Sequence, residues 1–264
     1  MSRPFDADPV ALPARWHDRV LVPTLAADTP PRPWVERVYA QYRTRLTDKR
    51  YPCHFGYRAE SRGEIYYAFL DAGEEARLAE ALSAFIHVWG GSPAVRNNLA
   101  VFLEPCARLD HRAYGDRFWR LLGDLQAADP APADASTRLA PDDALWEFEF
   151  ARHQFFVVGA APSYARRLSR NLGDAQVLLF QPRSVFMDHA TGALIDDKAR
   201  DTVRTRLGAW DSVAPHRDLG VYGAADNLEW RQYFLADDDQ RLYDRCPLAA
   251  APRAPAVADD PGAL

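Results

Sequence analysis

The segment LWEFEFARHQFFVV, residues 145–158, limits the fold of this chain more than any other. Its first half alternates between aromatic residues on one face and acidic residues on the other: Trp146, Phe148 and Phe150 against Glu147 and Glu149. Alternation with a period of two predicts a β-strand with one buried face. A second apolar run follows almost at once, which predicts a hairpin. Because a hairpin is antiparallel, it favours a mixed sheet over an all-parallel one.

Other apolar patterns predict helices and strands in partial alternation along the chain. Apolar residues at helical spacing predict helices over 34–48, 73–89, 110–127 and 197–210. Short apolar runs predict strands over 65–70, 99–103 and 177–180. We therefore expect one α+β domain over residues 34–245, with a mixed, largely antiparallel central sheet flanked by helices.

Both ends of the chain differ in composition from its centre. Residues 1–33 are rich in proline, which forbids a long helix, and we expect an arm that wraps the body or a partner. Residues 246–264 are mostly Ala, Pro and Asp, and we expect a disordered tail. An arm that gains by burying Trp16 and Leu21 is compatible with a homodimer.

Composition and missing motifs exclude several classes of function. The net charge is −5 and the charges are interspersed, which argues against nucleic acid as a partner. No stretch approaches the ~20 apolar residues of a membrane span, and the first residues do not resemble a signal peptide. Three widely spaced cysteines form no disulfide framework, so we expect a cytoplasmic protein. We find no nucleotide or flavin fingerprint, so electrons for any redox chemistry would come from a separate donor.

Four arginines flank the apolar strand predicted at 177–180. Arg166, Arg167 and Arg170 precede it at helical spacing, and Arg183 follows it. The planar guanidinium suits carboxylates and phosphates. These side chains either hold an anionic ligand or clamp the protein's own carboxylates.

Several segments, in this order, resemble those of the YqcI/YcgG family: YPCHFG, VFLEP, LWEFEFARHQFFVV, RRLSRNL, LLFQPR and EWRQYFL. Together they cover roughly residues 34–236. The resemblance implies a haem-dependent N-oxygenase of natural-product biosynthesis that oxidises a small guanidine or amine substrate. It also implies haem b as cofactor, with dioxygen and an external electron donor such as a reductase or ferredoxin.

A haem enzyme needs an axial ligand, cations for two propionates and an apolar pocket. With the resemblance in view, the four arginines are candidates for the propionates. His17 and His216 are equal candidates for the iron ligand, and His54 comes third. The family usually has a proline after the histidine that matches His216, where this chain has Arg217. A Cys53 thiolate is a further alternative, although a small buried residue is its simpler role. Each histidine alone is also explained by an ordinary hydrogen-bonding role.

Three acids are candidates to orient a cationic substrate. Glu147 and Glu149 share one strand face, which suits a guanidinium but also suits an ordinary solvent-facing strand. Glu229 lies beside aromatic residues, where a guanidinium gains cation–π attraction, although a capping box starting at Asp226 explains it equally well. Two functions remain open: the N-oxygenase, and a non-catalytic haem- or anion-binding protein.

Overall fold

A six-stranded open sheet organises the computed structural model, which describes residues 13, 15–22, 31–91, 96–134, 136–187 and 197–250. The strands are β1 (Val20–Val22), β2 (Ile65–Leu70), β3 (Asn98–Leu103), β4 (Phe148–Phe150), β5 (His153–Ala160) and β6 (Val177–Pro182). Their order across the sheet is β1-β2-β3-β6-β5-β4. The first two pairs are parallel and the other three are antiparallel. The prediction of one α+β domain with a mixed, largely antiparallel sheet is confirmed.

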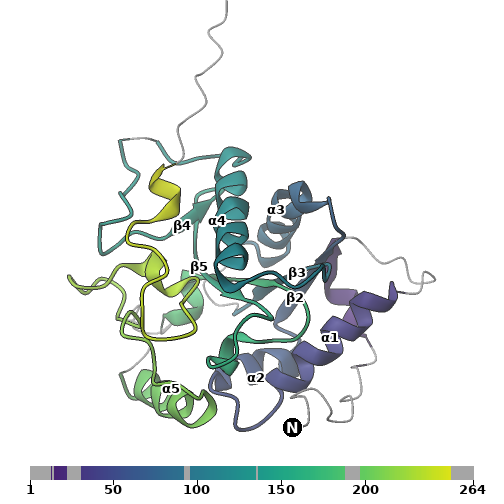
Figure 1. Ribbon diagram of the computed structural model, residues 1–264. Coiled ribbons are helices and arrows are strands. Elements are labelled where there is room, and N and C mark those ends of the chain that lie inside the picture. The colour runs from purple at the N-terminus through teal and green to yellow at the C-terminus, as the bar shows by residue number, and fades with distance from the viewer. Residues whose placement is uncertain are drawn as a thin grey trace, which may run out of the picture.

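Helices cover both faces of this sheet (Figure 1). The α-helices of the described residues are α1 (Pro33–Leu46), α2 (His54–Arg62), α3 (Leu78–Trp89), α4 (His111–Ala127) and α5 (Asp197–Trp210). Alternate residues of β2 enter opposite cores: Tyr67 and Phe69 pack with α1, whereas Ala68 and Leu70 pack with α3 and α4. The central strands are therefore buried on both faces, which explains their continuous apolar sequences.

The segment around the first three arginines does not form the helix that their spacing indicates. Only a short 3-10 turn, Leu168–Arg170, is present there. The Asp237 carboxylate accepts the backbone N–H groups of residues 165–167, so these donors are already engaged by a distant part of the chain. Tertiary hydrogen bonds here override a spacing that resembles a helix.

Two elements were missed by the sequence patterns. Helix α2 begins at His54, in a segment where the sequence patterns predicted no helix, and the Cys53 Sγ accepts the Gly56 N–H as its cap. Strand β1 lies within the predicted arm and extends the sheet beside β2. Just before it, Trp16 stacks on Tyr39 of α1 with ring centroids 4.4 Å apart. The rest of the predicted arm lies largely outside the described residues.

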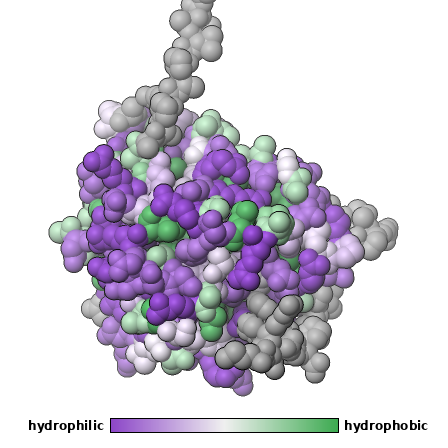
Figure 2. Space-filling view, in the orientation of Figure 1, coloured by the Kyte–Doolittle hydropathy of each residue, from purple (hydrophilic) through white to green (hydrophobic). Residues whose placement is uncertain are grey.

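At the other end of the chain, the predicted tail begins with Cys246, which is buried. A 3-10 turn, Pro247–Ala250, follows it, and the later residues lie outside the described part. On the face seen in Figure 2, hydrophilic side chains dominate and apolar ones are scattered among them. None of the described helices combines the length and apolar character that crossing a membrane requires.

Candidate functional site

A pocket of about 110 Å³ lies beside the β4–β5 hairpin. One buried water needs about 10–15 Å³, so this pocket has room for a group of several atoms. Residues from the end of α4, the following loop and the hairpin line it: Gln126, Asp129, Thr137, Arg138, Leu139, Trp146, Glu147, Glu149 and Gln154. Two of the three predicted catalytic acids, Glu147 and Glu149, therefore share one cavity.

The local structure of the hairpin aims its acids at this pocket. Ala151 and Arg152 have φ of 49° and 63°, as a tight two-residue hairpin turn requires. The Asp129 carboxylate accepts the Ala151 N–H at 3.0 Å, which ties the turn to the loop after α4. Because Phe148 and Phe150 are fully buried in the core, the acid between them, Glu149, faces the other way.

Behind the pocket, Glu147 shares an arginine with the third predicted acid. The Arg183 guanidinium donates from Nε to Glu147 Oε2 at 2.7 Å and from a terminal nitrogen to Glu147 Oε1. The same nitrogen donates to Glu229 Oε1 at 2.7 Å. The Tyr222 ring lies over this guanidinium, 3.8 Å from ring centroid to Cζ. Arg183 thus clamps the protein's own carboxylates, one of the two roles that the sequence left open.

Burial sets the electrostatics of this cluster. The Glu147 side chain is fully buried and that of Glu229 is 3% exposed, so two carboxylates meet one cation away from water. Burial raises the pKa of Glu147 to about 7, the charge of Glu229 adds to the rise, and the hydrogen bonds from Arg183 oppose it. Glu147 therefore exchanges a proton near neutral pH, and the ionised cluster carries one excess negative charge.

Glu229 is held by amides as well as by Arg183. Its Oε2 accepts hydrogen bonds from Asn227 Nδ2 at 3.0 Å and from Gln232 Nε2 at 3.3 Å. The 3-10 turn that it begins, Glu229–Gln232, has Leu228 as its N-cap residue and no side-chain cap. The alternative of a capping box starting at Asp226 is therefore wrong, because the Glu229 carboxylate is turned toward Arg183.

The other three arginines do not gather around a common anion site. The Arg167 guanidinium donates to the backbone oxygens of Ala236, Ala214 and Asp238. Arg170 likewise donates to backbone carbonyls, those of residues 159, 232 and 233. Arg166 is exposed. Two of these cations thus donate to backbone carbonyls of the protein itself rather than to a shared anion site.

The three histidines lie in different surroundings. His17 is in a 3-10 turn, Trp16–Arg19, and its side chain is 41% exposed, with Nε2 at 3.6 Å from Asp18 Oδ1. The buried His216 uses both ring nitrogens: Nε2 bonds the Gln240 oxygen at 2.9 Å, and Nδ1 accepts the Asp218 N–H at 3.1 Å. His54 begins α2, but its side chain is outside the described part.

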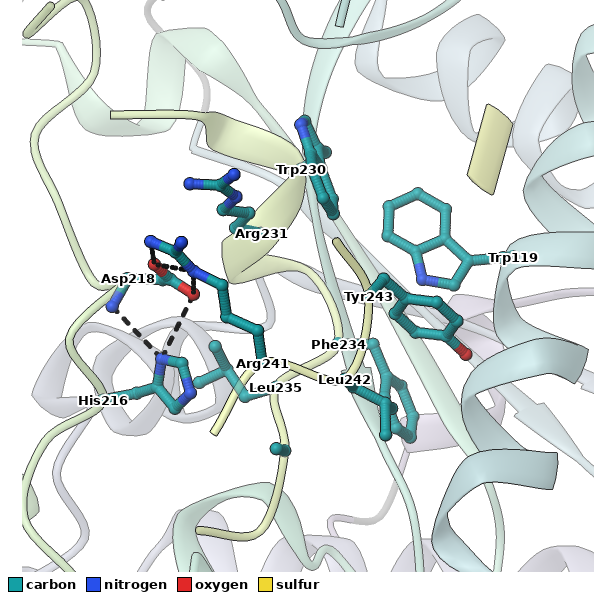
Figure 3. A pocket seen from close by; sticks show the side chains of 11 residues that line it. Trp119, His216, Asp218, Trp230, Arg231, Phe234, Leu235, Arg241, Leu242 and Tyr243 are labelled. Atoms are coloured by element: carbon teal, nitrogen blue, oxygen red, sulfur yellow. Dashed lines mark hydrogen bonds and ion pairs between the residues drawn. The ribbon is translucent and has the colours of Figure 1, made fainter. Parts of the chain in front are cut away.

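His216 borders a second, smaller pocket (Figure 3). Asp218 lies between His216 and Arg241, bonded to both, while Trp119 and Tyr243 close the opposite side (Figure 3). The volume is about 10 Å³, enough for one water molecule. Burial lowers the pKa of His216, so its imidazole is neutral and serves as a structural link between backbone segments.

Neither of these two pockets, as arranged here, has room for a haem. Sites for drug-sized ligands measure about 300–1,000 Å³, whereas these two pockets measure about 110 and 10 Å³. Neither ring nitrogen of His216 is free for iron. Burial raises the pKa of the Cys53 thiol, which disfavours a thiolate ligand. Within the described residues, no group of three or more His, Cys, Asp or Glu is placed to hold a metal ion.

Several lining residues were missed by sequence reasoning. Asp129 and Arg138 lie in a loop rich in Ala, Pro and Asp, and Tyr222 lies in an irregular segment. None of these segments has a periodicity that would predict which side chains face inward. The alternation of the hairpin was the one signal that pointed to this site.

The fold and the site together define a single-sheet α+β protein with a buried acidic cluster beside a small polar pocket. The chain belongs to the YqcI/YcgG family, whose model matches residues 42–249, so the resemblance seen in the sequence is confirmed. It is 32% identical over 207 residues to YqcI of Bacillus subtilis (strain 168), covering 76% of this chain and 81% of that protein. YcgG of the same organism is 31% identical over 206 residues, and that match covers 75% of this chain and 81% of YcgG.

A third relative carries a name that describes an activity. The Streptomyces lavendulae protein named "Putative N(omega)-hydroxy-L-arginine synthase DcsA" is 28% identical over 225 residues. The match covers 81% of this chain and 83% of that protein. No solved structure matches the chain.

Proposed function

We propose that this protein N-hydroxylates a guanidine nitrogen of a small molecule in a biosynthetic pathway. The observation that carries the proposal is the convergence of Glu147, Glu149 and Asp129 on one pocket. The name of the Streptomyces lavendulae relative, an N(omega)-hydroxy-L-arginine synthase, supports it. Carboxylates accept the paired N–H donors of a guanidinium, so such a pocket favours a guanidine over a neutral substrate.

The site already contains one example of how it binds a guanidinium. Arg183 is held between two carboxylates with an aromatic ring over its face. A substrate guanidinium in the adjacent pocket would meet the same chemistry, with Glu149 and Asp129 as acceptors and Trp146 as an aromatic wall. It would also supply a second cation to the cluster, which carries one excess negative charge when both of its carboxylates are ionised.

In the proposed reaction, one guanidine N–H becomes N–O–H and takes one oxygen atom from dioxygen. The second oxygen atom leaves as water, which consumes two electrons and two protons. We assign the electrons to a separate reductase or ferredoxin. Glu147 lines the pocket and has a pKa of about 7, so it can take up the proton that the substrate nitrogen loses.

The test is an incubation of purified protein with L-arginine, labelled dioxygen and a reductase–ferredoxin pair, followed by mass spectrometry. We expect a product that gains one labelled oxygen atom. Glu149→Gln should lose most of the product, whereas Glu36→Gln, on the exposed start of α1, should not. Binding of the substrate without any oxidised product would instead favour the non-catalytic binding protein.

Haem b is a separate prediction that rests on the resemblance to the family. It is tested by absorption spectroscopy of protein purified from cells supplied with a haem precursor. A Soret band that disappears in His17→Ala, or in His216→Ala with an unchanged melting temperature, would identify the ligand. A band kept in both variants would direct attention to His54 and Cys53. Colourless protein that gives no spectral change with hemin would contradict a haem cofactor.

A further inference from the structure

The acidic pocket also carries a cation at its rim. Arg138 lies in the loop after α4 and is exposed, whereas Glu147 on the same pocket is 5% exposed. The position of Arg138 is set by its backbone, whose N–H donates to the Asp134 oxygen at 3.1 Å. Within the described residues, no carboxylate forms an ion pair with its guanidinium. The pocket therefore has a negative floor and a positive rim.

We propose that Arg138 binds a carboxylate at the end of the substrate opposite its guanidinium, so that the pocket selects guanidino acids over simple guanidines. This inference rests on the proposed function and specifies its substrate class. A zwitterion of this kind places a positive charge on the acids and a negative charge on Arg138. A guanidine without a carboxylate leaves the rim cation unpaired, and a second amine at that end is repelled by it.

The wall between floor and rim suits an aliphatic linker. Leu139, next to Arg138 in sequence, lines the pocket and is 39% exposed. Trp146 lines the same pocket from the hairpin and is 5% exposed. A methylene chain between the two charged ends of the substrate would cover these surfaces and remove apolar area from water.

The test compares L-arginine with agmatine, which is the same molecule without its carboxylate. Each is titrated calorimetrically into the full-length protein, purified from cells supplied with a haem precursor, at low salt. We expect agmatine to bind about three- to tenfold more weakly, because the Arg138 contact is charge-assisted but exposed to solvent. Higher salt should reduce the difference.

Variants of Arg138 separate its role from a general effect on the fold. Arg138→Gln should weaken the binding of L-arginine and should not weaken that of agmatine, whose amine is no longer repelled, so the preference for L-arginine should disappear. Arg138→Lys should keep part of the preference, since the charge remains. Arg120→Gln, an exposed change on α4 outside the pocket, should leave both affinities unchanged. Thermal melting of each variant checks that the fold is intact.

The outcomes distinguish this inference from the proposed function. Equal binding of the two ligands by the wild-type protein, or a preference that survives Arg138→Gln, would overturn the role of Arg138 and leave guanidine hydroxylation standing. No binding of either ligand, together with no oxidised product, would overturn both.

Discussion

Replacing Arg183 by methionine should destabilise the protein strongly above neutral pH. The substitution keeps a long side chain but removes the donors that Arg183 supplies to Glu147 and Glu229, while Glu229 keeps its hydrogen bonds from the Asn227 and Gln232 amides. The Glu147 carboxylate, which is fully buried, and the Glu229 carboxylate, which is 3% exposed, would then face each other without a cation. Removing one partner of a buried ion pair costs about 3–5 kcal/mol, since an uncompensated charge stays behind. We expect a loss of this size in the free energy of unfolding at about pH 8.

The loss should be smaller at about pH 5, because Glu147 is then protonated. Its pKa is already about 7 with Arg183 in place, and removal of the cation raises that pKa further. At low pH the variant therefore buries one negative charge fewer than it does at about pH 8. Urea unfolding followed by tryptophan fluorescence at both pH values measures the difference.

A double variant serves as the matched control. Adding Glu147→Gln to Arg183→Met removes one of the stranded charges, so it should restore stability at about pH 8 relative to the single variant. The charge argument is refuted if Arg183→Met loses less than about 1 kcal/mol at both pH values. A loss that is independent of pH and unaffected by Glu147→Gln would point to packing instead.

Three further predictions concern buried polar groups. Glu147 should contribute about 3 kcal/mol to the wild-type free energy of unfolding, because burial raises its pKa from 4.5 to about 7. This contribution is fully present below pH 4.5 and is lost as pH rises through about 7. Urea titrations between these two pH values should show the loss in the wild type and not in Glu147→Gln. Glu60→Gln should lower the free energy of unfolding by about 1–3 kcal/mol, because the buried Glu60 carboxylate accepts hydrogen bonds from the Tyr39 hydroxyl at 2.7 Å and from the Tyr67 hydroxyl. Chemical unfolding measures this loss, and an unchanged free energy of unfolding would contradict the prediction. Arg167→Met should lower the free energy of unfolding by about 3 kcal/mol or more, because it leaves three backbone carbonyls without a donor. Arg166→Gln, at an exposed position, should change it by no more than about 0.5 kcal/mol. Equal melting temperatures for the two variants would contradict this difference.

Sequence patterns were sufficient for the elements that are buried on a regular face. The alternation of residues 146–150 predicted a strand with aromatic side chains inward, and Phe148 and Phe150 are indeed fully buried in β4. The apolar runs of β2 and β3 were equally clear, since both faces of these strands contact a core. In each case the signal and the burial have the same cause, removal of apolar side chains from water.

Prediction failed where the stabilising contact is of an unusual kind or joins residues that are distant in sequence. Helix α2 was missed because its cap is a cysteine sulfur, which is not among the usual N-cap side chains. The arginine segment read as a helix because nothing local shows that Asp237 binds its backbone donors. The link between Glu147 and Glu229 through Arg183 was invisible for the same reason, as it joins three separate segments.

If a substrate guanidinium binds the acidic pocket, it should release a proton from Glu147. A cation in the pocket would favour the ionised form and lower the pKa of Glu147 from about 7, so protein that is protonated before binding loses its proton on binding. The affinity for L-arginine should therefore rise between about pH 6 and about pH 8.

Calorimetric binding enthalpies should also differ between phosphate and Tris at about pH 7, by an amount proportional to the protons released. Glu147→Gln has no proton to release, so its observed binding enthalpies should be equal in the two buffers and its pH profile should be flat, while Glu36→Gln should behave as the wild type. Equal enthalpies in the two buffers for the wild-type protein would mean that the bound cation does not sense Glu147, and that the floor of the pocket is formed by Glu149 and Asp129 alone.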